Sequence, residues 1–219
     1  MSFDFLAVLA DWPLLARGAL MTLFLTAFSA AVGGTLGVLC AWARTEGPRW
    51  LKPIVGTYVE LIRNTPFIVQ LFFIFFGLPA LGVKLSPELA SVLAMVINLG
   101  AYTTEIVRAG ILATPRGQIE AAQSLALSPW QTFVRIVVPP ALRRVWPALV
   151  SQIVIVMLGS AVCGQISTEE LSFAANLIQS RNFRAFEAFL IAAAIYLVLA
   201  IAVRRFLNWA GPKLLFGRL

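Results

Sequence analysis

Polar side chains that could bind a small ligand interrupt the apolar sequence near the middle of the chain. Asn98, Tyr102 and Glu105 stand in an apolar stretch, with Thr103 and Thr104 between the last two. A helix would place Asn98 and Tyr102 on one face, because they are four residues apart. Amides, hydroxyls and charged groups can together hydrogen bond a zwitterionic ligand. The spacing therefore predicts a polar helix face that could line a ligand path.

Four other polar residues in apolar surroundings extend this candidate path, namely Gln70, Gln152, Ser160 and Gln165. Several of the candidates also have a structural explanation. Glu105 could pair with Arg108, three residues further along a helix, and Asn98 and Gln152 could hydrogen bond neighbouring helices. On the sequence, both explanations stay open.

The composition identifies the surroundings of these residues. The chain has 219 residues, of which 60% are hydrophobic and 12% charged, against roughly 45–50% and about 25% in soluble domains. The excess apolar surface must face lipid. At roughly 20 residues per span, the length allows about five to six helices, so we expect an all-α membrane protein with one domain.

Several classes of function are disfavoured by residue type. The chain has no histidine, which removes the usual proton shuttle and the commonest metal ligand, so we expect neither a metal site nor an enzyme. Cys40 and Cys163 stand in apolar surroundings without redox spacing. The net charge of +7 lies at the edges of apolar runs, which argues against nucleic acid as a partner. Asp4 and Asp11 precede the first apolar run, so we expect no signal peptide.

Five apolar segments predict five spans within one domain, residues 1–219, at about 18–43, 58–78, 87–111, 145–162 and 188–208. In the first span a stripe of small residues recurs every four positions, which allows close helix packing in lipid; it comprises Ser29, Gly33, Gly37 and Ala41. In the second span, Pro66 predicts a kink.

Positive charge predicts the orientation of these spans. Twelve lysines and arginines fall at one end of the five-span arrangement and four at the other, with Arg63 uncounted. Cytoplasmic segments are the ones enriched in lysine and arginine. We therefore expect a periplasmic N-terminus, a cytoplasmic C-terminus, and a cytoplasmic segment between the third and fourth spans.

That segment, residues 114–133, is called here the corner module. We expect Thr114 to cap a helix that starts at Pro115 and runs to Leu127, with Ile119, Ala122 and Leu125 or Ala126 on one face. Ser128 and Gln131 form a capping box for a second helix. Two short helices around a sharp turn predict a rigid knob, although an ordinary interfacial helix is an alternative.

The motifs in and around the corner module resemble those of a known family. Glu120-Ala121-Ala122, position 126, Ile136 and Val138-Pro139 match the spacing E-A-A-x3-G-x9-I-x-L-P of ABC importer permeases. Ala126 replaces the signature glycine and Val138 the leucine. The runs "RNTPFIVQLFFIFFGLP" and "GAYTTEIVRAGI" are similar to runs of the polar amino acid subfamily. The resemblance covers roughly residues 17–210.

This resemblance implies a type I ABC importer fold and an ATP-driven uptake function for a polar amino acid or a related molecule such as an opine. The implied coupling surface comprises Gly117, Gln118, Glu120, Ala121, Ala122, Leu125, Ala126, Ser128 and Pro129. The implied partners are two ATP-binding subunits, a second permease and a periplasmic binding protein. The chain has no G-x-x-x-x-G-K-[ST] phosphate loop, so ATP and Mg²⁺ would be bound by the partner subunit and no cofactor by this chain.

Two points leave alternatives open. Where the subfamily often carries a lysine–acid–Thr–Ser run, this chain has Met157-Leu158-Gly159-Ser160. We therefore expect a non-identical sister permease to contribute more to ligand recognition. The alternative functions are an ATP-independent secondary transporter or channel subunit, and a purely structural membrane subunit.

Overall fold

The computed structural model describes residues 3–214, and every regular element in that range is a helix. In chain order the elements are α1 (Phe5–Leu9), α2 (Trp12–Thr45), α3 (Leu51–Arg63), α4 (Phe67–Phe72), the π-helical η1 (Phe73–Gly77), α5 (Leu78–Ala80), α6 (Pro87–Leu112), α7 (Arg116–Ser124), α8 (Pro129–Thr132), the π-helical η2 (Phe133–Val137), α9 (Val138–Gly159), the 3₁₀-helical η3 (Ser160–Ile166), α10 (Leu171–Asn182) and α11 (Ala185–Leu214).

Four stretches of helix are long and apolar enough to cross a membrane, namely α2, α6, the continuous run Pro129–Ile166 and residues Ala185–Gly211 of α11. The run Leu51–Arg63 with Phe67–Ala80 makes a fifth if this pair, bent by 110°, counts as one broken span. The structure is thus the expected all-α membrane bundle of about five spans.

The fourth crossing helix begins earlier than the sequence pattern indicated. The apolar pattern placed only residues 145–162 in it, whereas helical structure is continuous from Pro129. Pro139 and Pro140 fall in the first turn of α9, directly after the π-helical η2, and a local π-helical adjustment allows a membrane helix to tolerate proline. These prolines therefore do not end the helix.

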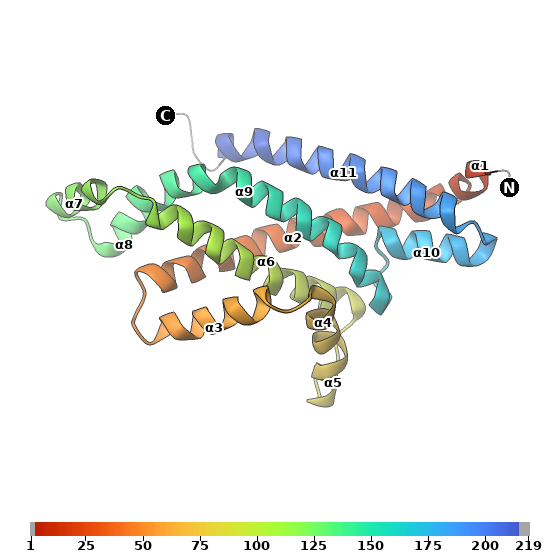
Figure 1. The fold of residues 1–219 in the computed structure, drawn as a ribbon, viewed down its shortest axis with the longest axis horizontal. Coiled ribbons are helices and arrows are strands. Elements are labelled where there is room, and N and C mark those ends of the chain that lie inside the picture. Colours follow the sequence, from red (N-terminus) through yellow and green to blue (C-terminus); the bar gives the residue numbers. More distant parts are fainter. Residues whose placement is uncertain (1–2, 215–219) are drawn as a thin grey trace.

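Close packing of α2 against α6 forms the centre of the bundle (Figure 1). The small-residue stripe of α2 is buried along its whole length, as its spacing predicted. A Cβ added at Gly33 would lie 2.9 Å from the Val96 carbonyl oxygen, and one at Gly37 would lie 2.4 Å from Thr103 Cβ. The two backbones can approach this closely only because these positions carry no side chain.

The helices place the two ends of the bundle far apart (Figure 1). The corner module, formed by α7 and α8, lies at the end where α2 and α6 finish and where α11 runs toward the C-terminus. Short helices α1 and α10 lie at the opposite end. The α4–α5 segment projects from the side of the bundle. Helices α2, α6, α9 and α11 all run between these two ends (Figure 1).

Glu170 fixes α10 to the bundle at the far end. Its side chain is fully buried and accepts hydrogen bonds from the amides of Ser172 (2.9 Å) and Phe173 (2.7 Å) and from the Tyr196 hydroxyl. Burial raises the pKa of the Glu170 carboxyl, and these hydrogen bonds oppose the rise. Because the folded state then holds the proton more tightly than the unfolded state, this group contributes less stability as pH rises through its raised pKa.

The glycine packing gives a matched pair of variants. We expect Gly37→Ala to lower the stability of the purified protein by roughly 1–3 kcal/mol, the usual effect of overpacking. Gly34→Ala should be neutral or slightly stabilising, because nothing lies within 4 Å of a Cβ at that position. Thermal unfolding in detergent measures both. Equal stability of the two variants would contradict the close contact of α2 with α6.

Candidate functional site

A cavity of about 360 Å³ lies between α4, α6 and α9, and it is called here the polar cavity because four polar side chains line it beside the apolar Pro66, Phe67, Ile155 and Val156. Asn98, Tyr102 and Gln152 line it, together with Thr65 and Gly159. Three of the polar residues proposed from the sequence therefore come together from two separate helices. The volume falls within the range of about 300–1,000 Å³ that is typical of small-molecule sites. Its amides and hydroxyls can both donate and accept hydrogen bonds.

Gln70 holds one wall of this cavity in place. Its side-chain nitrogen donates to the carbonyl oxygens of Ile62 (2.7 Å) and Thr65 (3.0 Å) and to the Thr65 hydroxyl (2.9 Å). Its side-chain oxygen accepts a hydrogen bond from Asn98 at 3.0 Å. The break at Pro66 leaves backbone carbonyls without helical partners, and such groups are costly to leave unpaired in a membrane. Gln70 satisfies them and ties the break to α6.

Glu105 belongs to a charge network and is absent from the lining of the cavity. It forms ion pairs with Arg44 at the end of α2 and with Arg108, whose Nη2 lies 2.9 Å from Glu105 Oε2. The expected pairing with Arg108 is therefore present, with a second arginine added. Next to this network, the guanidinium of Arg63 lies 5.5 Å from the centre of the Tyr102 ring. These contacts join α2, α3 and α6 beside the cavity.

The other two residues proposed for the ligand path have different surroundings. Ser160 is buried and donates a hydrogen bond of 2.7 Å to the Met157 carbonyl oxygen of its own helix. Gln165 is exposed in η3. Neither lines the polar cavity. In contrast, Thr65 and Gly159 do line it although sequence reasoning did not select them, because their positions depend on the helix break and on the pairing of α6 with α9.

The corner module packs tightly onto the helices that enter and leave it. Ala122 and Phe133 are buried, and Ile119 and Phe133 pack in one cluster with Ala41, Val107 and Leu149. Trp42 of α2 makes edge-on contacts with the rings of Trp130 and Phe133, at centroid distances of 5.6 and 6.5 Å. The Arg144 guanidinium donates to the Ala113 carbonyl oxygen at 2.6 Å. The module is therefore fixed to α2, α6 and α9, as a rigid knob requires.

The local details of the module correct three expectations. Pro115, not Thr114, is the N-cap of α7, and no side chain caps it. The helix ends at Ser124 instead of Leu127. Leu125, one of the two residues expected to share a face with Ile119 and Ala122, is 76% exposed whereas Ala122 is buried, because the helix has already ended before Leu125. The capping box is confirmed: the Gln131 amide donates to Ser128 Oγ (3.2 Å), and the Ser128 amide donates to Gln131 Oε1 (2.9 Å).

Comparison with known proteins identifies the family. The family described as "Binding-protein-dependent transport system inner membrane component" matches residues 33–216. The chain belongs to this family. It is the permease subunit of an ABC importer, as the resemblance of its motifs implied, and it is a multi-pass protein of the inner membrane.

Relatives of the permease match most of its length. The glutamine transport system permease protein GlnP of Escherichia coli K12 is 36% identical over 205 residues, which span 93% of this chain and 94% of that protein. The nopaline transport system permease protein NocM of Agrobacterium fabrum is 31% identical and covers 96% and 93%. The L-cystine permease TcyB of Bacillus subtilis is 37% identical over 78% and 73%.

Solved structures agree with the fold of the permease. A chain of the crystal structure of an amino acid ABC transporter with histidines is 34% identical, covers 98% of this chain and 100% of its own length, and has a TM-score of 0.86. ATP hydrolysis in such importers belongs to separate ATP-binding subunits, so the permease itself is not an enzyme. It works with those subunits and with a substrate-binding protein.

Ala126 occupies the signature glycine position of the permease in a conformation that favours glycine. Its φ angle is +54°, which lies in the left-handed region where a Cβ meets the following carbonyl oxygen. This corner therefore does not use ordinary helical angles. The corner keeps the turn that the family's glycine allows, and alanine adopts it at a cost of about 1–2 kcal/mol.

The strained alanine gives a direct prediction. We expect Ala126→Gly to stabilise the corner module by roughly 0.5–1 kcal/mol, because relief of the left-handed strain exceeds the extra entropy of glycine in the unfolded chain. Hydrogen exchange of residues 120–132 should slow by about twofold to fivefold. The control Ala121→Gly, within the helical part of α7, should have the opposite effect. Faster exchange in the Ala126→Gly variant would contradict the assigned turn.

Proposed function

We propose that the permease carries a polar amino acid, or a related small molecule such as an opine, across the bacterial inner membrane by alternating access. Its relatives are permeases for glutamine, L-cystine and nopaline. The observation that carries the proposal is the cavity lined by Asn98, Tyr102 and Gln152, whose neutral donors and acceptors suit a zwitterion. We assign these three residues to substrate contact, and Gln70 to positioning Asn98.

Glu105, Ser160 and Gln165 receive other roles in this proposal. The two arginines beside Glu105 neutralise its charge, so the acid and its partners would hold α2, α3 and α6 together beside the cavity. The Ser160 hydroxyl already donates a hydrogen bond to the Met157 carbonyl oxygen of its own helix. Gln165 lies outside the cavity lining and would meet the substrate only on the way in.

The proposed coupling surface is the outer face of the corner module, which would seat in a groove of an ATP-binding subunit. It comprises Gly117, Gln118, Glu120, Ala121, Leu125, Ala126, Ser128 and Pro129, all of them exposed. Ala122 faces inward and is buried, so its role would be to seat the module on the bundle. Leu125 presents an apolar side chain at the tip, which is the kind of group that a partner can bury.

The proposed assembly has two ATP-binding subunits, which hold ATP and Mg²⁺, and two permeases. With the basic end in the cytoplasm, the N-terminus is periplasmic, the C-terminus is cytoplasmic, and the binding protein docks at the end that carries α10. Met157 and Leu158 stand where the subfamily often has charges. We therefore propose a non-identical sister permease that contributes more to recognition.

The coupling surface is tested by a bulky substitution. We expect Ala121→Trp to reduce ATP-driven uptake in proteoliposomes by at least about tenfold, because a misfit at a central contact position typically costs 2 kcal/mol or more. Substrate-stimulated ATP hydrolysis should fall in parallel. The matched control Ala202→Trp, on an exposed position of α11, should retain uptake. Full transport by the Ala121→Trp complex would contradict the proposed surface.

The substrate cavity is tested by removing one amide. We expect Gln152→Leu to raise the KM for uptake by about tenfold, the effect of one lost hydrogen bond to a charged ligand group, with basal ATP hydrolysis unchanged. Ser151→Ala, at the preceding exposed position, should leave KM as it is. If Gln152→Leu transports with the parent KM, the cavity is not the substrate site.

The sister permease is tested by reconstitution. The chain reconstituted with only the ATP-binding subunits and the substrate-binding protein should show no more than background uptake, and uptake should appear when the second permease that co-purifies with it is added. Full transport without a second permease species would contradict the proposed division of recognition.

A further inference from the structure

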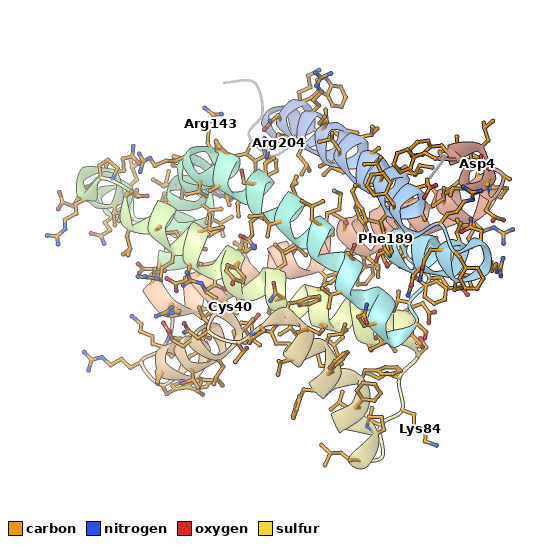
Figure 2. The ribbon with its side chains drawn as sticks, turned by 45° about the vertical axis from the view of Figure 1, so that its right-hand side comes forward. Asp4, Cys40, Lys84, Arg143, Phe189 and Arg204 are labelled. Atoms are coloured by element: carbon orange, nitrogen blue, oxygen red, sulfur yellow. The ribbon has the colours of Figure 1, made fainter. Side chains whose placement is uncertain are left out.

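A cavity of about 200 Å³ lies where the end of α2 meets the corner module, and it is called here the module pocket. Part of its lining is apolar, namely Ile119, Leu127, Phe133 and Val137. Glu46 and Gln123 line it as well, and both are exposed, so the pocket opens to the surface. Figure 2 shows the module, in green, at the end of the bundle away from Asp4. The pocket is therefore accessible to a partner that approaches the module.

Glu46 is the charged residue of this lining, and no ion pair in the described part of the chain includes it. Two nearby cations have other partners: Arg44 pairs with Glu105, and Lys52 donates to the Thr45 carbonyl oxygen at 2.8 Å. Glu46 is also the C-cap residue of α2, where the helix dipole disfavours a negative charge. A residue that breaks a local rule without compensation within the fold indicates a functional position.

The module pocket suits a side chain that is apolar along its length and positively charged at its tip. Arginine and lysine have this form, because their methylene stems lie along apolar surface while the charged head keeps polar partners. The stem would contact Leu127 and Phe133, and the head would meet the Glu46 carboxylate. The Gln123 amide oxygen can accept a further hydrogen bond from it. An acidic occupant would be repelled by Glu46, and an apolar one would leave this acid unpaired.

We propose that the module pocket receives an arginine or lysine side chain of the ATP-binding subunit, whose charge pairs with Glu46. The proposal rests on the proposed coupling surface. Pro129 belongs both to that surface and to the pocket lining, so a subunit seated on the module also covers the pocket. Glu120, an exposed acid of the coupling surface, does not line the pocket. Glu46 is thus a separate anchor, and it connects the partner directly to the end of α2.

Binding of the ATP-binding subunit to the purified permease complex in nanodiscs tests the charge pair. Glu46→Gln should weaken binding by about tenfold, the effect of losing a hydrogen bond between charged groups. Glu46→Lys should weaken it further, because like charges repel. The matched control Glu169→Gln removes an exposed acid next to α10, at the opposite end of the bundle, and should bind normally.

Thermal unfolding of the same variants without the ATP-binding subunit separates an anchor from a structural acid. The melting temperature of Glu46→Gln should equal or exceed that of the parent, because the acid has no ion-pair partner in the described part of the chain. Parent affinity in both Glu46 variants would overturn the proposal. So would a lower melting temperature combined with parent affinity, because it would make Glu46 a structural residue.

Photo-cross-linking identifies the occupant. A benzophenone amino acid in place of Gln123 should cross-link to the ATP-binding subunit, at a peptide that contains an arginine or a lysine. The same probe in place of Ala202, exposed on α11, should not reach that subunit. Replacing the identified cation with glutamate should weaken binding to the parent permease and restore binding to Glu46→Lys. Cross-links to a second permease alone, or no gain from the exchange of charges, would overturn the proposal.

The result is separable from the test of the coupling surface. Ala121→Trp asks whether the module contacts an ATP-binding subunit at all, whereas the Glu46 variants address the pocket alone. Loss of uptake in Ala121→Trp together with normal binding by Glu46→Gln and Glu46→Lys would retain the coupling surface and reject the pocket. Full transport by Ala121→Trp would reject the surface itself.

Discussion

The structure depends on how the backbone carbonyl groups at a break in the second span obtain hydrogen-bond donors. At Pro66 the chain turns by 110° between α3 and α4, and the carbonyl groups of Ile62 and Thr65 lose their helical partners. Gln70 donates to both and accepts from Asn98 on α6. The Gln70 side-chain amide therefore supplies hydrogen bonds to the carbonyl groups freed by the break, and it fixes a polar wall in the centre of the bundle. Without such a partner, each unpaired group would cost several kcal/mol in lipid.

Helix packing, ion pairs and ring contacts link the cavity to the corner module. Helices α2 and α6 pack along a stripe of small residues, and Arg44 and Arg108 hold Glu105 near their ends. Beyond these ends, Trp42 contacts Trp130 and Phe133 of the module. A displacement of the module would therefore be passed to α2 and α6 through packed rings and ion pairs, because close-packed side chains transmit strain and do not absorb it.

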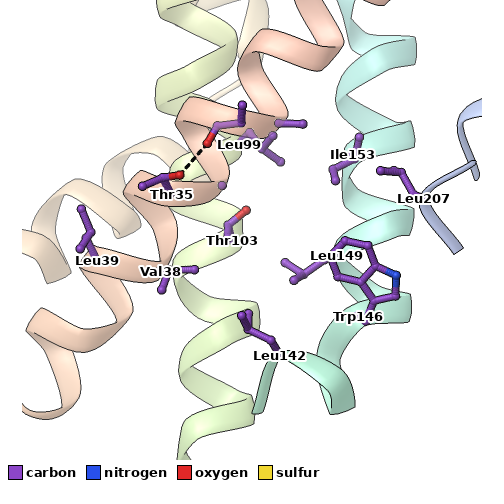
Figure 3. A pocket seen from close by; sticks show the side chains of 13 residues that line it. Thr35, Val38, Leu39, Leu99, Thr103, Leu142, Trp146, Leu149, Ile153 and Leu207 are labelled. Atoms are coloured by element: carbon purple, nitrogen blue, oxygen red, sulfur yellow. Dashed lines mark hydrogen bonds between the residues drawn. The ribbon is translucent and has the colours of Figure 1, made fainter. Parts of the chain in front are cut away.

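Helices α6 and α9 line two different cavities with different faces. Asn98 and Gln152 line the polar cavity, whereas Leu99 and Ile153 line a largely apolar cavity of about 460 Å³ between α2, α6, α9 and α11 (Figure 3). This division follows from the helical period alone, since residues that differ by one position point in different directions. It also explains why Thr103 lines the apolar cavity although it follows Tyr102 in the sequence.

The sequence by itself determined the membrane class, the stripe of small residues, the capping box and the family, because these depend on composition and on short spacing along one helix. It also indicated Asn98, Tyr102 and Gln152 as candidate ligand-path residues, because they are polar residues in apolar surroundings. Only the tertiary structure decided that these three share one cavity with Thr65, that Gln70 serves the helix break, and that Glu105 lies between two arginines. Those outcomes depend on which helices meet and at what rotation, and this is set by packing between segments far apart in the chain. The left-handed conformation of Ala126 belongs to the same class, because the packed module imposes an angle that alanine alone would avoid.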